Sequence, residues 1–186
     1  MFAGALVSGL ACAFGAAAAG TAAGVPVSFT VSGTAFKVSA TRLEGEGFIQ
    51  YASLREEREG TPRPVALTGI RSAELSDLCQ SVVTPTPVGT ITMRVTAGAR
   101  QPVKAQDLVI DLQQMRGDVT FSQLELGRDA SDSRVSRVAG TPGHYSQQAS
   151  GVTIRNLRLH TSSMTAGTFQ LTGMSVSMGT GRDECF

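Results

Sequence analysis

The stretch Thr90-Ile-Thr-Met-Arg-Val-Thr96, TITMRVT, alternates polar and apolar residues at every position. Successive side chains of a β-strand point to opposite faces, so this period of two predicts a strand with one apolar face. The same period recurs along most of the chain. Further alternating sets are Phe36, Val38 and Ala40; Leu108, Ile110 and Leu112; Val119 and Phe121; Leu124 and Leu126; Val152 and Ile154; Leu157 and Leu159; Phe169 and Leu171; and Met174, Val176 and Met178.

Glycine, proline and Ser-Thr pairs, which are typical of turns, separate these short sets. Short alternating segments joined by turns predict an all-β fold. We expect an antiparallel β-sandwich or a barrel-like domain over residues 25–186, with a hairpin at 27–40 that turns at Ser32-Gly33-Thr34. Gly45-Glu46-Gly47 is also expected to be a turn. Two polar segments interrupt the pattern and are expected to be exposed connections: residues 55–64, and a long polar loop at 127–148.

Four stretches share a small residue followed by spaced aliphatic residues, which suggests duplicated β units. A chance likeness produced by the common alternation is the alternative. The four stretches begin at Ala40, Ala73, Ala105 and Ala149.

Residues 1–24 form an apolar segment rich in alanine and glycine, and the first charged residue of the chain is Lys37. Ala17-Ala18-Ala19 fits the small-residue pattern of signal-peptidase sites, so we expect a secretion signal. No basic residue precedes the segment, which favours a true start upstream of Met1. An uncleaved hydrophobic helix that anchors the chain in a membrane is the alternative, and Cys12 is expected to be an apolar residue of the leader.

Two cysteines remain beyond the leader, Cys79 and Cys185. In an exported chain, two thiols usually form a disulfide, which we expect here. A zinc site would need about four clustered ligands, and the only histidines, His144 and His160, stand far from either cysteine in sequence. A cysteine nucleophile would need a free thiol. No metal and no cofactor is therefore expected.

The formal net charge of +1 and the scattered lysines and arginines argue against a nucleic-acid partner. The nucleophile elbow of α/β-hydrolases, the phosphate-binding loop and the dinucleotide fingerprint are all missing from the sequence. His144 beside Ser146, and His160 at an expected strand end beside Ser162 and Ser163, are the only histidine–serine neighbours. Glu44 and Glu46 are further candidates for a base. Each of these is more often an ordinary surface or turn residue, so the catalytic residues are unknown.

Four stretches carry a family resemblance: FTVSGTAFKVSATRLEGEGFIQYAS (29–53), LCQSVVTPTP (78–87), TAGTFQLTGMSVSM (165–178) and the final ECF. They resemble a family of small exported actinobacterial proteins of the Streptomyces type, whose members are often labelled cholesterol esterase. The resemblance implies a secreted or cell-envelope location and, for the labelled activity, hydrolysis of sterol or other lipid esters. It carries over no catalytic residue.

Two functions therefore stand at the sequence level. The first is an exported, envelope or extracellular β protein that binds a lipid or sterol or has a structural role. The second is a cholesterol esterase-like carboxylic-ester hydrolase. A surface protein tethered to the membrane through residues 1–24 and assembling through its repeats is a third expectation.

Overall fold

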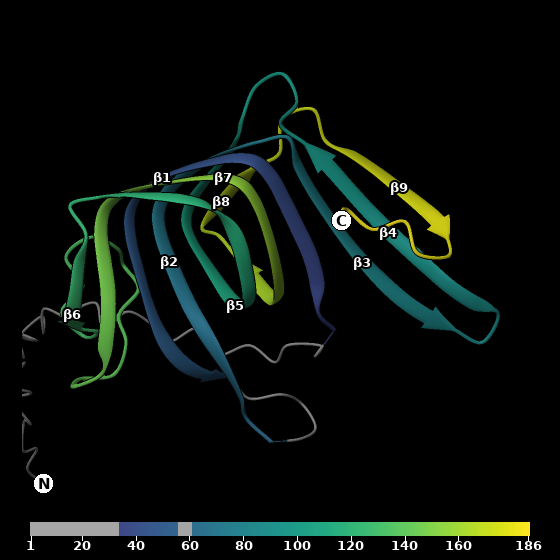
Figure 1. Cartoon of the computed structure of the whole chain (residues 1–186). Helices are drawn as coiled ribbons and strands as arrows, with labels where there is room; N and C mark the ends of the chain where they lie inside the picture. Colours follow the sequence, from purple (N-terminus) through teal and green to yellow (C-terminus); the bar gives the residue numbers. More distant parts are fainter. Residues whose placement is uncertain (1–33, 56–60) are drawn as a thin grey trace, which may run out of the picture.

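A computed structural model describes residues 34–55 and 61–186, and every helix or strand in these ranges is a β-strand of one antiparallel sheet (Figure 1). The all-β, antiparallel prediction is thus confirmed for these residues. The segment 1–24 and the residues Ser32 and Gly33 of the expected turn lie outside them. The strands are β1 (Phe36–Arg55), β2 (Arg63–Ser76), β3 (Leu78–Thr86), β4 (Gly89–Ala97), β5 (Val103–Ser122), β6 (Glu125–Asp129), β7 (Tyr145–Thr165), β8 (Thr168–Gln170) and β9 (Ser175–Thr180).

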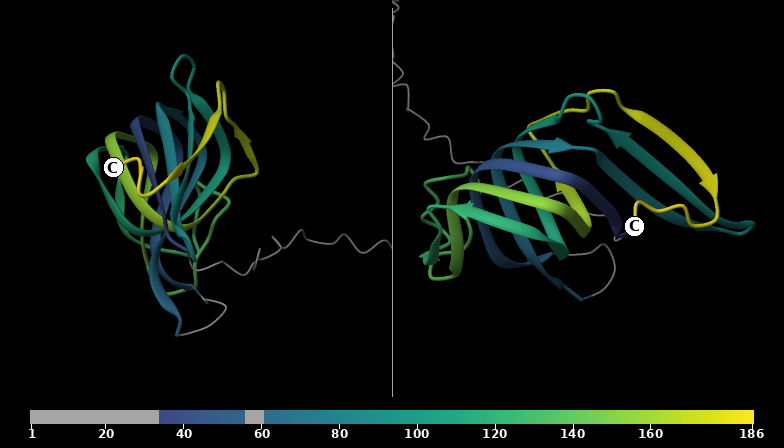
Figure 2. Two further views of the ribbon diagram at one scale, coloured as in Figure 1. Left: turned by 90° about the vertical axis from the view of Figure 1, so that its right-hand side faces the viewer. Right: turned by 45° about the horizontal axis from the view of Figure 1, so that its top comes forward.

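Four long strands close into a ring. Strand β1 pairs with β2 along one edge and with β7 along the other, while β5 pairs with both β2 and β7. The two views of Figure 2 show these strands curving around a common interior. Closure leaves these four strands without a long free edge, which is the usual weak point of an open sheet.

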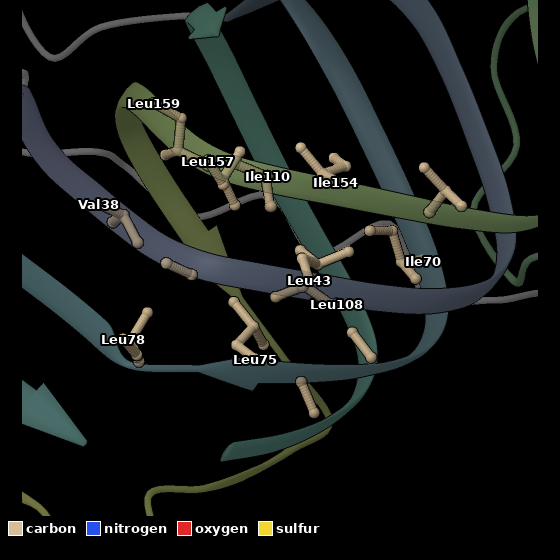
Figure 3. Packing of buried hydrophobic residues seen from close by; sticks show 14 of the residues in the cluster. Val38, Leu43, Ile70, Leu75, Leu78, Leu108, Ile110, Ile154, Leu157 and Leu159 are labelled. Carbon is tan, nitrogen blue, oxygen red and sulfur yellow. The ribbon is translucent and has the colours of Figure 1, made fainter. Parts of the chain in front are cut away.

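The main hydrophobic core fills the interior of the ring, and all four strands contribute to it (Figure 3). Each strand supplies an alanine together with larger aliphatic residues. The four stretches proposed as repeats lie one in each ring strand, but their origin by duplication stays a prediction. Their buried residues include Ala40 and Leu43, Ala73 and Leu75, Ala105 and Leu108, and Ala149 and Val152.

A single residue with positive φ lies inside each of two long strands, β5 and β7. At that residue the strand changes the set of alternate side chains, odd-numbered or even-numbered, that faces the core. Asn156 has a φ of 53°; before it Val152 and Ile154 are buried, and after it the odd-numbered Leu157 and Leu159 are buried. Asp107, with a φ of 50°, separates buried Ala105 from buried Leu108 in the same way. The expectation of many short strands is therefore wrong here. A local break in alternation marks a bend within one strand, comparable to the effect of a β-bulge.

The predicted turn at Gly45-Glu46-Gly47 is wrong, because these residues lie in the middle of β1. The two glycines serve close packing. A Cβ on Gly45 would lie 2.8 Å from Ile70 Cγ2, and one on Gly47, whose φ is 70°, would lie 2.0 Å from the Val135 carbonyl oxygen. Glycine is the residue that permits both the left-handed conformation and such an approach.

The long polar segment 127–148 is shorter as a loop than expected, because β6 and β7 take its two ends and leave residues 130–144 between them. This loop packs against β1. Val135 and Val138 contact a second small core around Ile49 and Tyr51, and the Tyr51 hydroxyl donates a hydrogen bond of 3.0 Å to the Ala139 carbonyl oxygen. The loop is therefore tied to the body at its centre.

Strands β3, β4 and β9 extend away from the ring as a three-stranded sheet, which we call the wing (Figure 1). Only Leu78 and Ala97, at its base, belong to the core cluster. After β9, residues 181–186 turn back along one face of the wing toward the ring, as Figure 2 shows, and we call this segment the tail.

Candidate functional site

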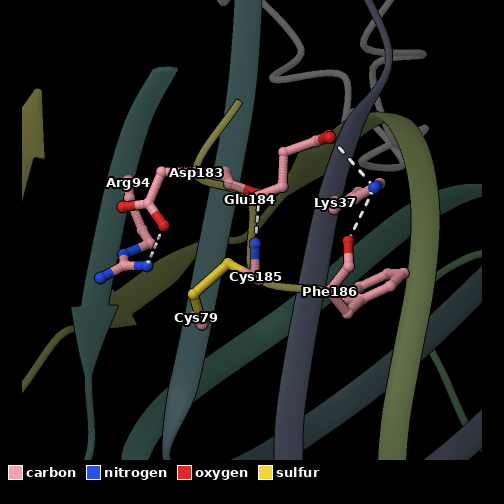
Figure 4. The surroundings of a disulfide bond; sticks show 8 residues. Lys37, Cys79, Arg94, Asp183, Glu184, Cys185 and Phe186 are labelled. Carbon is pink, nitrogen blue, oxygen red and sulfur yellow. Dashed lines mark hydrogen bonds and ion pairs between the residues drawn. A yellow bond between two sulfur atoms is a disulfide. The ribbon is translucent and has the colours of Figure 1, made fainter. Parts of the chain in front are cut away.

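A disulfide fixes the tail to the wing (Figure 4). The sulfur atoms of Cys79, in β3, and Cys185, in the tail, lie 2.07 Å apart, with a Cα–Cα distance of 5.9 Å. The Cys185 amide also donates a hydrogen bond of 3.0 Å to Ser81 Oγ. The structure thus brings the two cysteines together as the sequence predicted.

The tail covers the polar face of the wing. Cys79, Ser81 and Arg94 share this face because antiparallel partners point the same way. Arg94 makes an ion pair of 3.0 Å with Asp183, and Thr92 Oγ1 donates a hydrogen bond of 2.6 Å to the Gly181 carbonyl oxygen. One face of the wing is therefore occupied by the chain itself.

Within residues 34–55 and 61–186, no segment covers the opposite face of the wing, and this face carries no charged side chain. Val82, Met93 and Met178 lie in one row across its three strands, because each is the register partner of the next. Val176 and Met178 are 52% and 63% exposed, and none of the apolar residues of this face packs on either core. The alternation in sequence predicted the strands, but it gave no sign that their apolar side would stay uncovered. The full face consists of Gln80, Val82, Thr84, Ile91, Met93, Val95, Val176, Met178 and Thr180, and we call it the apolar wing face.

His160 lies within β7, five residues before its last residue, so its expected place at a strand end is wrong. Its ring meets the Phe186 ring edge-on, with 5.4 Å between the centroids. The neighbouring Ser162 and Ser163 are buried, and among the described residues no hydrogen bond joins either hydroxyl to His160. This histidine and these serines do not form a nucleophile–base pair here.

His144 belongs to a group of polar residues at the ends of the 130–144 loop. The Asp129 carboxylate accepts hydrogen bonds from the Ser131 amide and hydroxyl, both at 2.8 Å, and from the Gly143 amide at 2.7 Å. These bonds lower the pKa of Asp129 below its ordinary 3.8, and the nearby His144 contributes to the same effect. A carboxylate held in its ionised form is a weak general base.

Ser146, the other neighbour of His144, is fully buried and donates a hydrogen bond of 3.0 Å to the Arg128 carbonyl oxygen. Its hydroxyl therefore has a structural partner in β6. Glu44 and Glu46 lie on β1 rather than in a turn, and each pairs with an arginine, Arg42 and Arg71 respectively. The predicted candidates for catalysis are thus dispersed over the described part of the chain.

Sequence reasoning missed a buried ion pair. Asp111 is 1% exposed, and its Oδ2 pairs with the Arg55 guanidinium, whereas its Oδ1 has no hydrogen-bond partner among the described residues. The stretch Leu108-Val-Ile-Asp-Leu112 could have indicated this pair. An aspartate within an apolar run is expected to be buried with the run, and a buried carboxylate needs a partner. The pair lies near Tyr51, whose pKa is raised above 10.0 by burial and, secondarily, by the charge of Asp111.

Within residues 34–55 and 61–186, no group of three or more histidine, cysteine, aspartate or glutamate side chains is arranged to hold a metal ion. The same residues contain no helix with the length and hydropathy needed to cross a bilayer.

Comparison with known proteins places the chain in a family. No curated protein and no solved structure matches it. A protein-family model matches residues 32–186, a range that includes the nine strands of the described residues, the disulfide and the tail. The chain therefore belongs to the family of unknown function DUF6230.

Proposed function

We propose that the chain is an exported protein of the cell envelope or cell exterior that acts by binding and not by catalysis. The bonded pair Cys79–Cys185 supports this, because such bonds persist in oxidising compartments. The resemblance to exported actinobacterial proteins and the apolar segment 1–24 support it as well. The separation of His160 from the serine hydroxyls around it favours binding over ester hydrolysis.

A lipid or sterol is the proposed ligand, and the apolar wing face is its binding surface. The interior of the ring is packed: a Cβ on Gly45 would already lie 2.8 Å from Ile70 and 3.2 Å from Val152. A ligand inside the ring would have to displace this core. The apolar wing face instead offers a row of aliphatic side chains with no charged residue, and this observation carries the proposal.

The shape of the wing favours a lipid surface as the occupant. The β3–β4 hairpin ends at Pro87 and Val88, and Val88 is 97% exposed at this tip. An interface between two copies would bury the face of the sheet, but it gives no reason for an aliphatic side chain at the free tip. Insertion of the tip and the adjoining face into a lipid layer would bury Val88 together with Val176 and Met178. Large exposed apolar patches commonly mark such contacts.

Flotation of the full chain with vesicles of phosphatidylcholine, with and without cholesterol, tests the proposal. The double variant Val176→Ser/Met178→Ser should lower the bound fraction at least about tenfold, because burial of each such side chain contributes about 1.5–3 kcal/mol. Leu124→Ser/Leu126→Ser is the matched control, since these residues are 41% and 64% exposed near the other end of the sheet. Absence of vesicle binding, or a dimer that the wing variant alone disrupts, would overturn lipid as the occupant.

Hydrolysis of sterol or long-chain esters is the second candidate, and the group of Asp129, Ser131 and His144 favours it. A serine hydroxyl and a carboxylate are in direct contact there, close to an imidazole. If this group acts, purified chain should hydrolyse cholesteryl or nitrophenyl esters, and Ser131→Ala and His144→Ala should each abolish the activity. Equal rates in both variants would exclude this group.

A further inference from the structure

Two arginines differ from most others in the described part of the chain, because they lack a carboxylate partner. Arg116 and Arg158 form no ion pair with any residue of 34–55 or 61–186. Arg100 and Arg155 share this property. Ion pairs are made by Arg42, Arg55, Arg71, Arg94, Arg128, Arg134, Arg137 and Arg182.

Arg116 and Arg158 also stand directly opposite each other. They are register partners in the β5–β7 pairing, and the adjacent pair is Gln114 with His160. Met115, Leu157 and Leu159 alternate with these residues and pack on the core, so the polar set points outward. Like charges at directly opposed positions destabilise a sheet by repulsion. The pair is therefore a position where an external anion would relieve a built-in repulsion.

The tail provides a wall beside this pair. Phe186 is half-buried, and its ring centroid lies 5.5 Å from the Arg158 guanidinium carbon and 5.2 Å from Lys37 Nζ. Glu184 and the main-chain oxygen of Phe186 already occupy the Lys37 ammonium, at 3.2 and 2.7 Å. The disulfide at Cys185, the preceding residue, holds the Phe186 side chain in place (Figure 4). The wall is thus fixed independently of any ligand.

Together these residues line a hollow of about 190 Å³, formed by Gln114, Arg116, Arg158, His160 and Phe186. This is smaller than the roughly 300 Å³ at which sites for drug-sized molecules begin. A single small group fits such a space, whereas a whole lipid or sterol does not. Two planar guanidinium groups match a tetrahedral oxyanion, whose oxygens they can bind in a bidentate manner.

We propose that Arg116 and Arg158 bind a phosphate or sulfate group on the outer side of the ring, with the Gln114 amide as a further donor and Phe186 as the wall. The group can be a free ion or the head of a larger ester, because the oxyanion chemistry is shared. This site is separate from the apolar wing face and does not depend on it.

Calorimetric titration of the full chain with inorganic phosphate and sulfate, against chloride at equal ionic strength, tests the site. Saturable binding of either oxyanion is expected, and Arg158→Gln or Arg116→Gln should weaken it about tenfold or more, since charge-assisted bidentate bonds are the strong ones. Arg100→Gln is the matched control: Arg100 is exposed, also lacks a carboxylate partner among the described residues, and does not line the hollow. It should bind as the unchanged chain does.

Vesicles containing phosphatidic acid distinguish the two sources of the oxyanion. Binding of inorganic ions supports a free ligand, and binding to these vesicles alone, lost in Arg116→Gln/Arg158→Gln but kept in Val176→Ser/Met178→Ser, supports a headgroup. Binding of neither probe, or an equal loss in Arg100→Gln, would overturn the proposal. The wing variants should leave oxyanion binding unchanged. A negative result at the arginine pair can therefore be told apart from a failure of lipid binding at the wing.

Discussion

Lys37 Nζ, near the start of β1, donates a hydrogen bond of 2.7 Å to the main-chain oxygen of Phe186, 149 positions later in the chain. The same ammonium makes an ion pair of 3.2 Å with Glu184. The tail is therefore held on three strands, by Arg94 and Thr92 of β4, by the disulfide on β3 and by this contact on β1. Its last residue is a fixed part of the outer surface of the ring, which is why Phe186 can serve as a wall.

Removal of the disulfide should lower the free energy of unfolding by about 4–5 kcal/mol in the chain-entropy model, because the bond closes a loop of roughly a hundred residues. The two cysteines are separated by 106 positions. Urea unfolding of Cys79→Ser/Cys185→Ser, compared with the unchanged chain in reductant, measures the effect. The two samples should agree, and a loss below about 1 kcal/mol in either would contradict the model.

Gly45→Ala should destabilise the fold by about 1–3 kcal/mol, the usual cost of inserting a methyl group into a packed core. The new Cβ would lie 2.8 Å from Ile70 Cγ2 and 3.2 Å from Val152 Cγ1. Gly179→Ala in β9 is the control, because a Cβ there meets nothing within 4 Å. Thermal unfolding of both variants should show a clear loss for the first and almost none for the second.

Arg55→Met should cost about 3–5 kcal/mol, because it leaves the Asp111 carboxylate buried without its counter-charge. The side chains of Arg55 and Asp111 are 21% and 1% exposed. Arg137→Met is the control: its side chain is 83% exposed, and its pairing with Asp107 should contribute less than about 1 kcal/mol. The double variant Arg55→Met/Asp111→Leu should recover most of the loss, and failure to recover would show that Arg55 acts mainly through other contacts.

Acid should weaken the anchoring of the 130–144 loop. Because hydrogen bonds from Ser131 and Gly143 lower the folded-state pKa of Asp129 below 3.8, they contribute stability above that value, which is lost as the pH falls through the lowered pKa. Thermal unfolding of the unchanged chain and of Asp129→Asn should therefore differ most at neutral pH and converge in acid. A constant difference at every pH would contradict this assignment.

Tyr51 should ionise above the ordinary value of 10.0, because burial raises its pKa and Asp111 adds to the effect, while Arg55 opposes it. The chain has two tyrosines, so Tyr145→Phe leaves Tyr51 as the single reporter. Ultraviolet titration of this variant should give a raised midpoint in the folded state and an ordinary one in denaturant. The raised pKa contributes stability below pH 10.0 that is lost as the pH rises through the folded-state value.

The period-two pattern predicted the strands but not their lengths. Ile91, Met93 and Val95 lie on one face of β4 as expected. Val152–Ile154 and Leu157–Leu159 were separated in the prediction because the phase changes at Asn156, although they belong to one strand. A periodicity argument cannot distinguish a bend within a strand from a strand end, because both remove one step of alternation.

The candidate sites also differ in how far the sequence alone predicts them. The cysteine pair was predictable from the number of cysteines and the expected compartment. The pairing of Arg116 with Arg158 was not, because it depends on the register between β5 and β7, with irregularities on either side of it. Phe186 joins them only through the path of the tail, which no local pattern specifies.

The closed ring also sets the order in which the chain can fold. Strand β1 is synthesised first among the described strands, yet one of its two neighbours is β7, whose paired residues run from Ser146 to Thr161. Until that late segment is available, β1 exposes one complete edge. Folding must therefore be slow and dominated by long-range pairings, and a nascent chain would depend on protection from aggregation during that interval.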